Sequence, residues 1–344
     1  MSAPTPFSEG GYSQYREQVL TSAKKLRAVG AHIHLDLPRI VVIGNQSAGK
    51  SSLIEAISGI EVPRNAGTCT RCPMECRLLS SKEEWSCQVS IRWEFDADGR
   101  SKDHVEQVPF GGLLTDKSDV ELMLRRAQTA VLDSGKRPLA YYANMNAGDL
   151  YALPWDLSTL PFSQNVVCVD ISGPDLTYLS FVDLPGIISN ADANVVKFVE
   201  RMVQSYISGT CLIVVALSME TDIENQTALR LAREADHDDS RTVGVMTKAD
   251  RWPVRCMEAR EIELWLEILE GRSQDHHLRH GYYCTRQPNA AERAAGITPS
   301  EAREAETLFF QTTAPWDTSA NKQHLGTENL VRHLSNMLAE MIRV

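Results

Sequence analysis

The chain has 344 residues, of which 43% are hydrophobic and 23% are charged, and its formal net charge at pH 7 is −10. This length suits one large α/β domain with additions or two modest domains, and the composition is ordinary for a globular protein. The acidic balance argues against a protein held on nucleic acid mainly by electrostatics, so we expect no nucleic-acid partner.

The expected compartment is the cytoplasm. The longest apolar run, residues 211–217, is the size of a strand and falls far short of the roughly 20 residues that span a bilayer. The N-terminus lacks the basic region and apolar core of a signal peptide. The eight cysteines show no spacing typical of a disulfide framework.

Two groups of residues resemble metal ligands. Cys69, Cys72 and Cys76 form C-x₂-C-x₃-C, which could suggest zinc. A closed zinc site usually takes four ligands, and no partner pair is evident, although a distant fourth ligand stays an alternative. The histidine-rich run 275–280 is interpreted as a solvated helix end or loop rather than a ligand set.

The first two segments differ in character. Residues 1–11 are rich in Pro, Ser and Gly and are expected to form a disordered lead. From Tyr12 to about Val29, apolar residues recur at three- and four-residue steps, which predicts an amphipathic helix within 12–35.

Strand-like and helical runs then alternate along the chain. The predicted strands are 40–43, 87–95, 166–171, 179–182, 211–217, 242–246 and 282–285. The predicted helices are 51–58, 118–132, 194–207, 224–235, 256–270 and 300–310. This order predicts a three-layer α/β/α domain whose sheet is mixed and mostly parallel, with 87–95 pairing in antiparallel fashion.

The final segment, 319–344, contains another amphipathic helix from about Glu328. Its apolar stripe could pack against the leading helix as part of a helical bundle. No breaking residue precedes Val344, so we expect the natural helix to continue past this point.

Residues 44–51 read G-x-x-x-x-G-K-S between a predicted strand and a predicted helix, the context of a P-loop. Gly44 and Gly49 allow the backbone to wrap around phosphate, Lys50 supplies a positive charge, and the Ser51 hydroxyl can bind Mg²⁺. This motif identifies a nucleoside-triphosphate site in a P-loop NTPase fold. The residues expected to contact nucleotide here are Gly44, Asn45, Gln46, Ser47, Ala48, Gly49, Lys50, Ser51 and Ser52.

Two further motifs follow predicted strands. Asp183 and Gly186 belong to a D-L-P-G sequence, in which the carboxylate can hold Mg²⁺ through water and the glycine N–H can meet the γ-phosphate. Thr247, Lys248 and Asp250 belong to a T-K-x-D sequence. A carboxylate at Asp250 can accept hydrogen bonds from guanine N1–H and N2–H₂, which adenine does not offer. The sequence therefore predicts GTP rather than ATP.

A loop threonine, Thr70, lies between the P-loop helix and the next predicted strand. Its hydroxyl can close on Mg²⁺ and the γ-phosphate and so form a switch. Ser51, Thr70 and Asp183 are thus the expected Mg²⁺ residues.

The combined motifs G-N-Q-S-A-G-K-S-S, V-P-R-x-x-G-x-x-T-R-x-P, D-L-P-G and T-K-x-D resemble the dynamin superfamily of large GTPases, and within it the fungal and Mx-like branches. The resemblance covers nearly the whole chain. It implies a GTPase domain over 36–318 between two bundle helices, and it places the last base-contacting loop at 282–287, with Thr285 and Arg286 as the expected contacts.

The resemblance also implies a mechanism. Ile187 follows Gly186 and cannot orient water, so Gln46 would position the attacking water. Ser47 would help to coordinate K⁺ or Na⁺, with backbone groups around Asn65 and Gly67 completing that site. Gln46, Ser47, Lys50 and Thr70 are the expected catalytic residues. An alternative is that Gln46 is a tolerated variable residue of the P-loop.

The family pattern further implies that two GTPase domains meet across their nucleotide sites, with Asp222 as the expected contact in trans. The alternative for Asp222 is a helix N-cap before 224–235. A longer protein would be linked to membrane remodelling, with membrane association only through regions absent from this chain. A stand-alone GTP-switched binding module with slow hydrolysis is the main alternative function, and an ATP-dependent motor or kinase is the third.

Overall fold

The computed structural model describes residues 38–341 except for 64–69, 97, 134–135, 153–159, 175, 177–178, 189–190 and 252–258. The expected lead 1–11, the expected helix 12–35, Asn65, Gly67 and Cys69 lie outside the described residues. The division into a GTPase domain and bundle helices stays a prediction.

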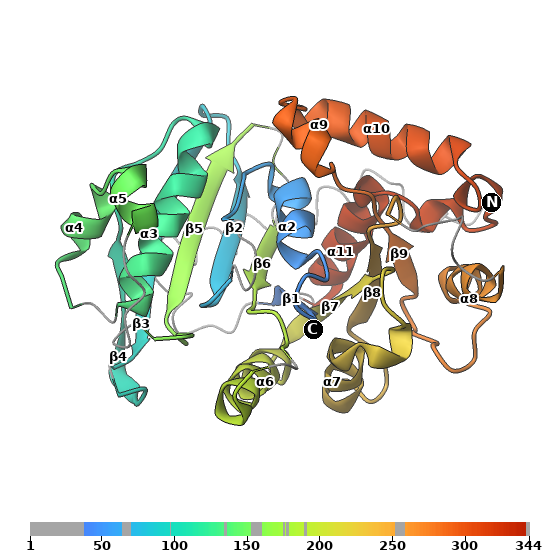
Figure 1. The fold of residues 1–344 in the computed structure, drawn as a ribbon, viewed down its shortest axis with the longest axis horizontal. Coiled ribbons are helices and arrows are strands. Elements are labelled where there is room, and N and C mark those ends of the chain that lie inside the picture. Colours follow the sequence, from blue (N-terminus) through green and yellow to red (C-terminus); the bar gives the residue numbers. More distant parts are fainter. Residues whose placement is uncertain are drawn as a thin grey trace, which may run out of the picture.

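The centre of the fold is a sheet of nine described strands in the order β4-β3-β5-β2-β6-β1-β7-β8-β9 (Figure 1). The strands are β1 (Arg39–Gly44), β2 (Met74–Ser80), β3 (Ser86–Phe95), β4 (Ser101–Pro109), β5 (Val166–Gly173), β6 (Leu179–Asp183), β7 (Cys211–Ser218), β8 (Thr242–Thr247) and β9 (Tyr282–Cys284). Most neighbours pair in parallel, and β3 runs antiparallel to both β4 and β5. The predicted mixed, mostly parallel sheet is confirmed.

Helices cover both faces of the sheet. Those described are α2 (Lys50–Ser58), α3 (Val120–Leu132), α4 (Leu139–Ala143), α5 (Ala147–Ala152), α6 (Ala193–Ile207), α7 (Thr227–Ala235), α8 (Ala259–Leu269), α9 (Ala290–Ala294), α10 (Pro299–Thr312) and α11 (Thr327–Met341). The expected helix from about Glu328 is confirmed by α11, whereas α7 begins at Thr227, after a 3₁₀ turn over Ile223–Asn225. None of the described helices is long and apolar enough to cross a bilayer.

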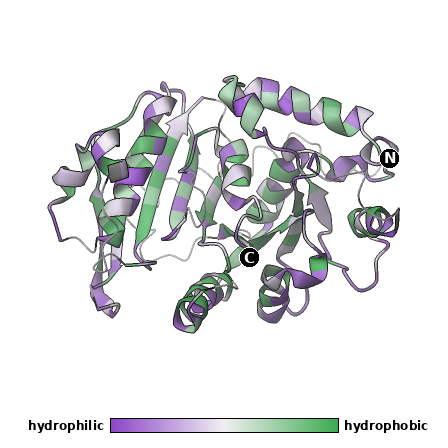
Figure 2. Ribbon diagram, viewed as in Figure 1, coloured by the Kyte–Doolittle hydropathy of each residue, from purple (hydrophilic) through white to green (hydrophobic). Residues whose placement is uncertain are grey.

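Alternation along β1 divides the core into two layers. Ile40 and Val42 pack with buried residues of α2, α3 and α11, whereas Val41 and Ile43 pack with buried residues of α6, α7 and α8. Successive side chains of a strand point to opposite faces, so a continuously apolar strand is one covered on both sides. Figure 2 shows the corresponding hydrophobic colour on the central strands.

Strands β2 and β4 were not among the predicted strands, for different reasons. Strand β2 carries Glu75 and Arg77, which are buried and form an ion pair at 2.7 Å. Arg92 of β3 approaches the other Glu75 oxygen at 2.5 Å, and although burial would raise the pKa of Glu75, the two arginines lower it overall. Strand β4 is a mostly exposed edge strand with a polar sequence. Neither strand shows the apolar pattern that predicts a core strand.

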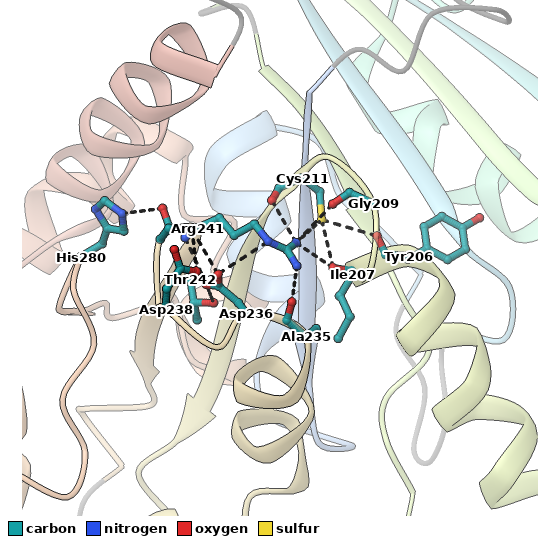
Figure 3. Close-up of polar contacts among 11 residues, drawn as sticks. Tyr206, Ile207, Gly209, Cys211, Ala235, Asp236, Asp238, Arg241, Thr242 and His280 are labelled. Carbon is teal, nitrogen blue, oxygen red and sulfur yellow. Dashed lines mark hydrogen bonds and ion pairs between the residues drawn. The ribbon is translucent and has the colours of Figure 1, made fainter. Parts of the chain in front are cut away.

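One arginine ties the amino-terminal end of β8 to two helix ends (Figure 3). The Arg241 guanidinium donates to the carbonyls of Ile207, the last residue of α6, at 2.7 Å, of Gly209 at 3.3 Å, and of Ala235, the last residue of α7, at 2.5 Å. Asp236, which is buried, accepts a hydrogen bond from the Arg241 backbone N–H at 3.1 Å, and its Oδ1 lies 3.7 Å from Arg241 Nε. Because terminal helix carbonyls have no partner within the helix, this side chain satisfies groups that would otherwise lack a donor.

Arg241→Ala is therefore expected to lower the free energy of unfolding by about 2–4 kcal/mol, because the helix-end carbonyls lose their donor and buried Asp236 loses the guanidinium 3.7 Å away. Urea unfolding followed by circular dichroism measures the change. Arg100→Ala is the matched control, since the Arg100 side chain is 79% exposed and lies 3.7 Å from its ion-pair partner Asp98. Equal urea midpoints for the two variants would contradict this role of Arg241.

Candidate functional site

Residues from the predicted motifs converge on one pocket of about 370 Å³. It lies where the P-loop follows β1 and the T-K-x-D residues follow β8, at the carboxyl ends of parallel strands. The predicted residues that line it are Gln46, Ser47, Ala48, Gly49, Lys50, Ser51, Ser52, Thr70, Gly186, Thr247, Lys248 and Asp250. Three other predicted residues do not line the pocket. Gly44 and Asn45 directly precede Gln46 in the sequence, and Asp183 accepts hydrogen bonds from the lining residues Ser51 and Thr70.

The Lys50 side chain is hydrogen-bonded to the backbone of its own P-loop. Lys50 opens α2 and is buried, and its ammonium donates to the carbonyls of Gly44 at 3.2 Å and Asn45 at 3.3 Å. Ser47 and Gly49 both have positive φ, at 63° and 89°. This left-handed backbone turns the loop back towards the start of α2, where successive N–H groups can bind an anion.

A hydrogen bond joins the P-loop to the T-K-x-D motif. Thr247 Oγ1 donates to the Ala48 carbonyl at 2.7 Å, and a Cβ on Gly49 would lie only 3.1 Å from that hydroxyl oxygen. The loop that would bind phosphate and the strand end that would select the base are therefore held in one fixed arrangement.

The D-L-P-G segment packs equally closely on the P-loop. The Gln46 N–H donates to the Ile187 carbonyl at 2.9 Å, and the Ile187 N–H donates to the Gly44 carbonyl at 3.1 Å. A Cβ on Gly186 would lie 2.8 Å from Gln46 Cα and 3.1 Å from Lys50 Nζ. Only glycine fits at this contact without displacing the P-loop.

Three oxygen-bearing side chains meet beside Lys50. Ser51 Oγ lies 3.2 Å and Thr70 Oγ1 lies 3.1 Å from Asp183 Oδ2, and the two hydroxyls are 3.4 Å apart. Asp183 is 1% exposed, and its Oδ1 has no hydrogen-bond partner among the described residues. Burial raises the pKa of its carboxyl, while the Lys50 charge and the two hydroxyls oppose that shift. Oxygen donors of this kind fit a magnesium ion.

The T-K-x-D residues carry further charges into the pocket. Lys248 adopts a φ of 62° and forms an ion pair with Glu220. Asp250 lies 4.0 Å from Arg286 Nε. Asp250 lines the same pocket as the P-loop residues.

The predicted base loop, 282–287, reaches the pocket at its last residue. Thr285 is fully buried, its N–H donating to the Met246 carbonyl at 2.9 Å, and neither it nor Arg286 lines the pocket. The next two residues, Gln287 and Pro288, do line it. Three further lining residues were not expected: Pro63, which belongs to the V-P-R motif but was given no contact, and Arg251 and Arg293, which no motif includes.

Asn45 joins the P-loop to the segment that holds Asp222. Its Nδ2 donates to the Asn225 carbonyl, and its Oδ1 accepts from the Ala228 N–H, both at 3.2 Å. Asp222 is exposed, and its side chain accepts no capping hydrogen bond from the backbone of the 3₁₀ turn that it precedes. Its described side-chain partner is Asn225 Nδ2, at 3.3 Å.

Two of the three cysteines of the C-x₂-C-x₃-C group lie among the described residues. Cys72 and Cys76 are buried, and burial raises the pKa of the Cys72 thiol to about 12. Within the described ranges, no group of three or more His, Cys, Asp or Glu side chains is arranged to hold a metal ion.

Comparison with known proteins indicates the same family as the motifs. The model of the family described as "Dynamin family" matches residues 40–249. The interferon-induced GTP-binding protein Mx of Epinephelus coioides is 30% identical over 339 residues, which cover 96% of this chain and 47% of that protein. The Mx2 protein of Mus musculus is 29% identical over 309 residues, covering 87% of this chain and 40% of that protein. The chain thus spans less than half of these relatives, and the likeness to a fungal branch stays a prediction.

The close approach of Gly186 gives a direct test of the site's geometry. Gly186→Ala should weaken GTP binding by about tenfold or more, because the added methyl group must push Gln46 or the Lys50 ammonium out of place. Titration calorimetry measures the affinity. Gly112→Ala is the control, because a Cβ there meets no atom within 4 Å. Unchanged affinity in Gly186→Ala would show that this contact does not shape the binding site.

Proposed function

The chain belongs to the dynamin family, and from that premise we propose that it binds GTP and hydrolyses it to GDP and phosphate, with water as the nucleophile. The observation that carries the proposal is the meeting of Ser51, Thr70 and Asp183 next to the P-loop lysine, with Asp250 in the adjoining pocket. Phosphoryl transfer needs positioning and charge neutralisation, and this arrangement offers both.

Asp250 is proposed to select guanine. Its carboxylate can accept from N1–H and N2–H₂ of the base, and adenine would leave a largely desolvated carboxylate without donors. The Asp250 side chain is only 16% exposed, so solvent would not compensate for that loss. Lys248, held by Glu220, can lay its aliphatic stem along the base.

Ser51 and Thr70 are proposed to hold Mg²⁺ directly, and Asp183 to hold it through water. When bound, the ion neutralises charge on the β- and γ-phosphates. The buried Asp183 Oδ1 supports this proposal, because an unpartnered carboxylate oxygen in the interior is costly unless a cation or ordered water satisfies it.

Gln46 is proposed to orient the attacking water, and Ser47 to contribute to a site for K⁺ or Na⁺. Gln46 lines the pocket and is anchored through its backbone to Ile187, the apolar residue that follows Gly186. The positive φ of Ser47 turns its backbone within the same loop. The P-loop would then both bind phosphate and position the nucleophile.

Two GTPase domains are proposed to meet across their nucleotide pockets. Two observations support this proposal: Asp222 is exposed, and Asn45 of the P-loop is hydrogen-bonded to Asn225 and Ala228, which follow Asp222 in the sequence. A contact at Asp222 could therefore affect the position of the P-loop. In a cytoplasmic protein of greater length, such dimerisation would be linked to membrane remodelling. Under the alternative, a GTP-switched binding module, turnover would be slow and independent of protein concentration.

Asp250→Asn tests the choice of base. The amide cannot accept both guanine donors, but it can donate to the C2 oxygen of xanthine, so affinity should fall about a hundredfold for GTP and rise for xanthosine triphosphate. Competition with a fluorescent nucleotide measures both affinities. Asp98→Asn is the control, since its side chain is 74% exposed on the β3–β4 hairpin. Unaltered GTP preference in Asp250→Asn would refute the base assignment.

Gln46→Ala tests the hydrolytic role. Binding of GTP should be retained, because Gln46 is held by its backbone, while phosphate release should fall by about two orders of magnitude or more. Lys50→Ala should instead abolish binding. Both are measured by nucleotide titration and by phosphate release at several protein concentrations. Retained turnover in Gln46→Ala would exclude that residue from positioning water.

A further inference from the structure

A second pocket of about 580 Å³ lies at the other end of the sheet, between the loop 270–281, β9 and α11. We call it the histidine pocket. Its basic lining residues are His276, His277, Arg279, His280, His324, Arg332 and His333. Five of the chain's nine histidines therefore gather here, and none of the lining residues is Asp or Glu, although the chain carries a net charge of −10.

The fold fixes several of these side chains. His280 is joined through its Nε2 to the Ser240 carbonyl at 2.9 Å, next to the Arg241 cluster (Figure 3). His324 Nδ1 lies 2.9 Å from the Tyr282 carbonyl. The Tyr283 ring stacks on His324 at 4.4 Å between ring centroids and on His333 at 5.2 Å. The pocket wall is thus built from packed elements.

Donor groups remain available in this wall. Arg279 is exposed and forms no hydrogen bond or ion pair with any residue that the structure describes. Arg332, also exposed, donates to Asn329 Oδ1 at 3.3 Å and has no carboxylate partner within the same ranges. His276 Nδ1 and His333 Nε2 are buried atoms without a described partner.

The chemistry of the lining favours an anion over a metal ion. The stacked rings of His324 and His333 lie against Tyr283, and no three His, Cys, Asp or Glu side chains in the described ranges converge on one point. Glu224 lies 3.1 Å from His276 Nε2 and Asp239 interacts electrostatically with His277, but neither carboxylate is part of the pocket wall. Two guanidinium groups without carboxylates suit phosphate, which matches their planar array of N–H donors.

We propose that the histidine pocket binds a compact anion that carries several phosphate groups. Its volume lies in the range of small-molecule sites, which favours a compact ligand over an extended acidic peptide. A soluble molecule and a lipid headgroup can both carry such phosphates, since the recognised chemistry is the same. The site is separate from the nucleotide pocket: it adjoins the amino-terminal end of β8, whereas the P-loop contacts Thr247 at its carboxyl end.

The test is calorimetric titration of the full chain with inositol hexakisphosphate. Because the P-loop also offers a phosphate site, Lys50→Ala is titrated in parallel. Wild type and Lys50→Ala should both bind the probe, and Arg279→Glu combined with Arg332→Glu should weaken binding at least about tenfold, because two charged donors are replaced by repulsive carboxylates. Arg279→Gln with Arg332→Gln should weaken it less. Thermal melting verifies that each exposed-residue variant is folded.

Arg100→Glu is the matched control, since it changes the net charge in the same direction on an exposed side chain away from the pocket. Loss of binding in Lys50→Ala, or equal weakening by one Arg100→Glu change, would overturn the proposal. A polyglutamate peptide that binds as tightly as the probe would also overturn it.

Flotation with vesicles that contain phosphatidylinositol 4,5-bisphosphate distinguishes the two sources of phosphate. Co-flotation that depends on Arg279 and Arg332 supports a lipid headgroup. Absence of co-flotation, together with tight binding of the soluble probe, supports a soluble ligand. The result is independent of GTP hydrolysis.

Discussion

The buried carboxylate of Asp183 is the constraint around which the candidate nucleotide site is organised. At 1% exposure it sits at the end of β6, and the charge of the Lys50 ammonium opposes the rise in its pKa that burial causes. An isolated ionised carboxylate in the interior is strongly unfavourable, so the cation and the hydroxyls of Ser51 and Thr70 must be held near it. Three segments far apart in the sequence are thereby brought to one point: the start of α2, the loop before β2 and the end of β6.

The order of the strands makes this meeting possible. β6 and β7 flank β1 in parallel, and β8 follows β7, so the P-loop, the D-L-P-G turn and the T-K-x-D turn all emerge at one edge of the sheet. Short-range contacts then fix the turns, chiefly the bond from Thr247 to Ala48 and the glycine contact of Gly186 with Gln46. The Arg241 side chain and the histidine pocket lie at the opposite, amino-terminal ends of β8 and β9. The two ends of these strands therefore carry different sets of side chains.

The sequence predicted the parts of this structure whose information is local. The three nucleotide motifs each join a strand end to a turn within a few residues, and the core strands can be recognised by their apolar composition. Strand β2 was missed because its buried charges satisfy one another across strands, and β4 because an exposed edge strand needs no apolar face. Gln287, the last residue of the predicted base loop, lines the pocket with Pro288, and base contacts by Thr285 and Arg286 stay a prediction. His280 and His333 meet only through the tertiary fold, so the run 275–280 alone could not indicate a pocket.

A crystal structure of the chain with Mg²⁺ and a slowly hydrolysed GTP analogue would test the central claim most directly. The account predicts that the phosphates lie in the loop 44–51, that the Ser51 and Thr70 hydroxyls coordinate the ion, and that the Asp250 carboxylate lies within hydrogen-bond distance of guanine N1 and N2. A nucleotide whose base lies away from Asp250, or whose phosphates lie outside that loop, would contradict it.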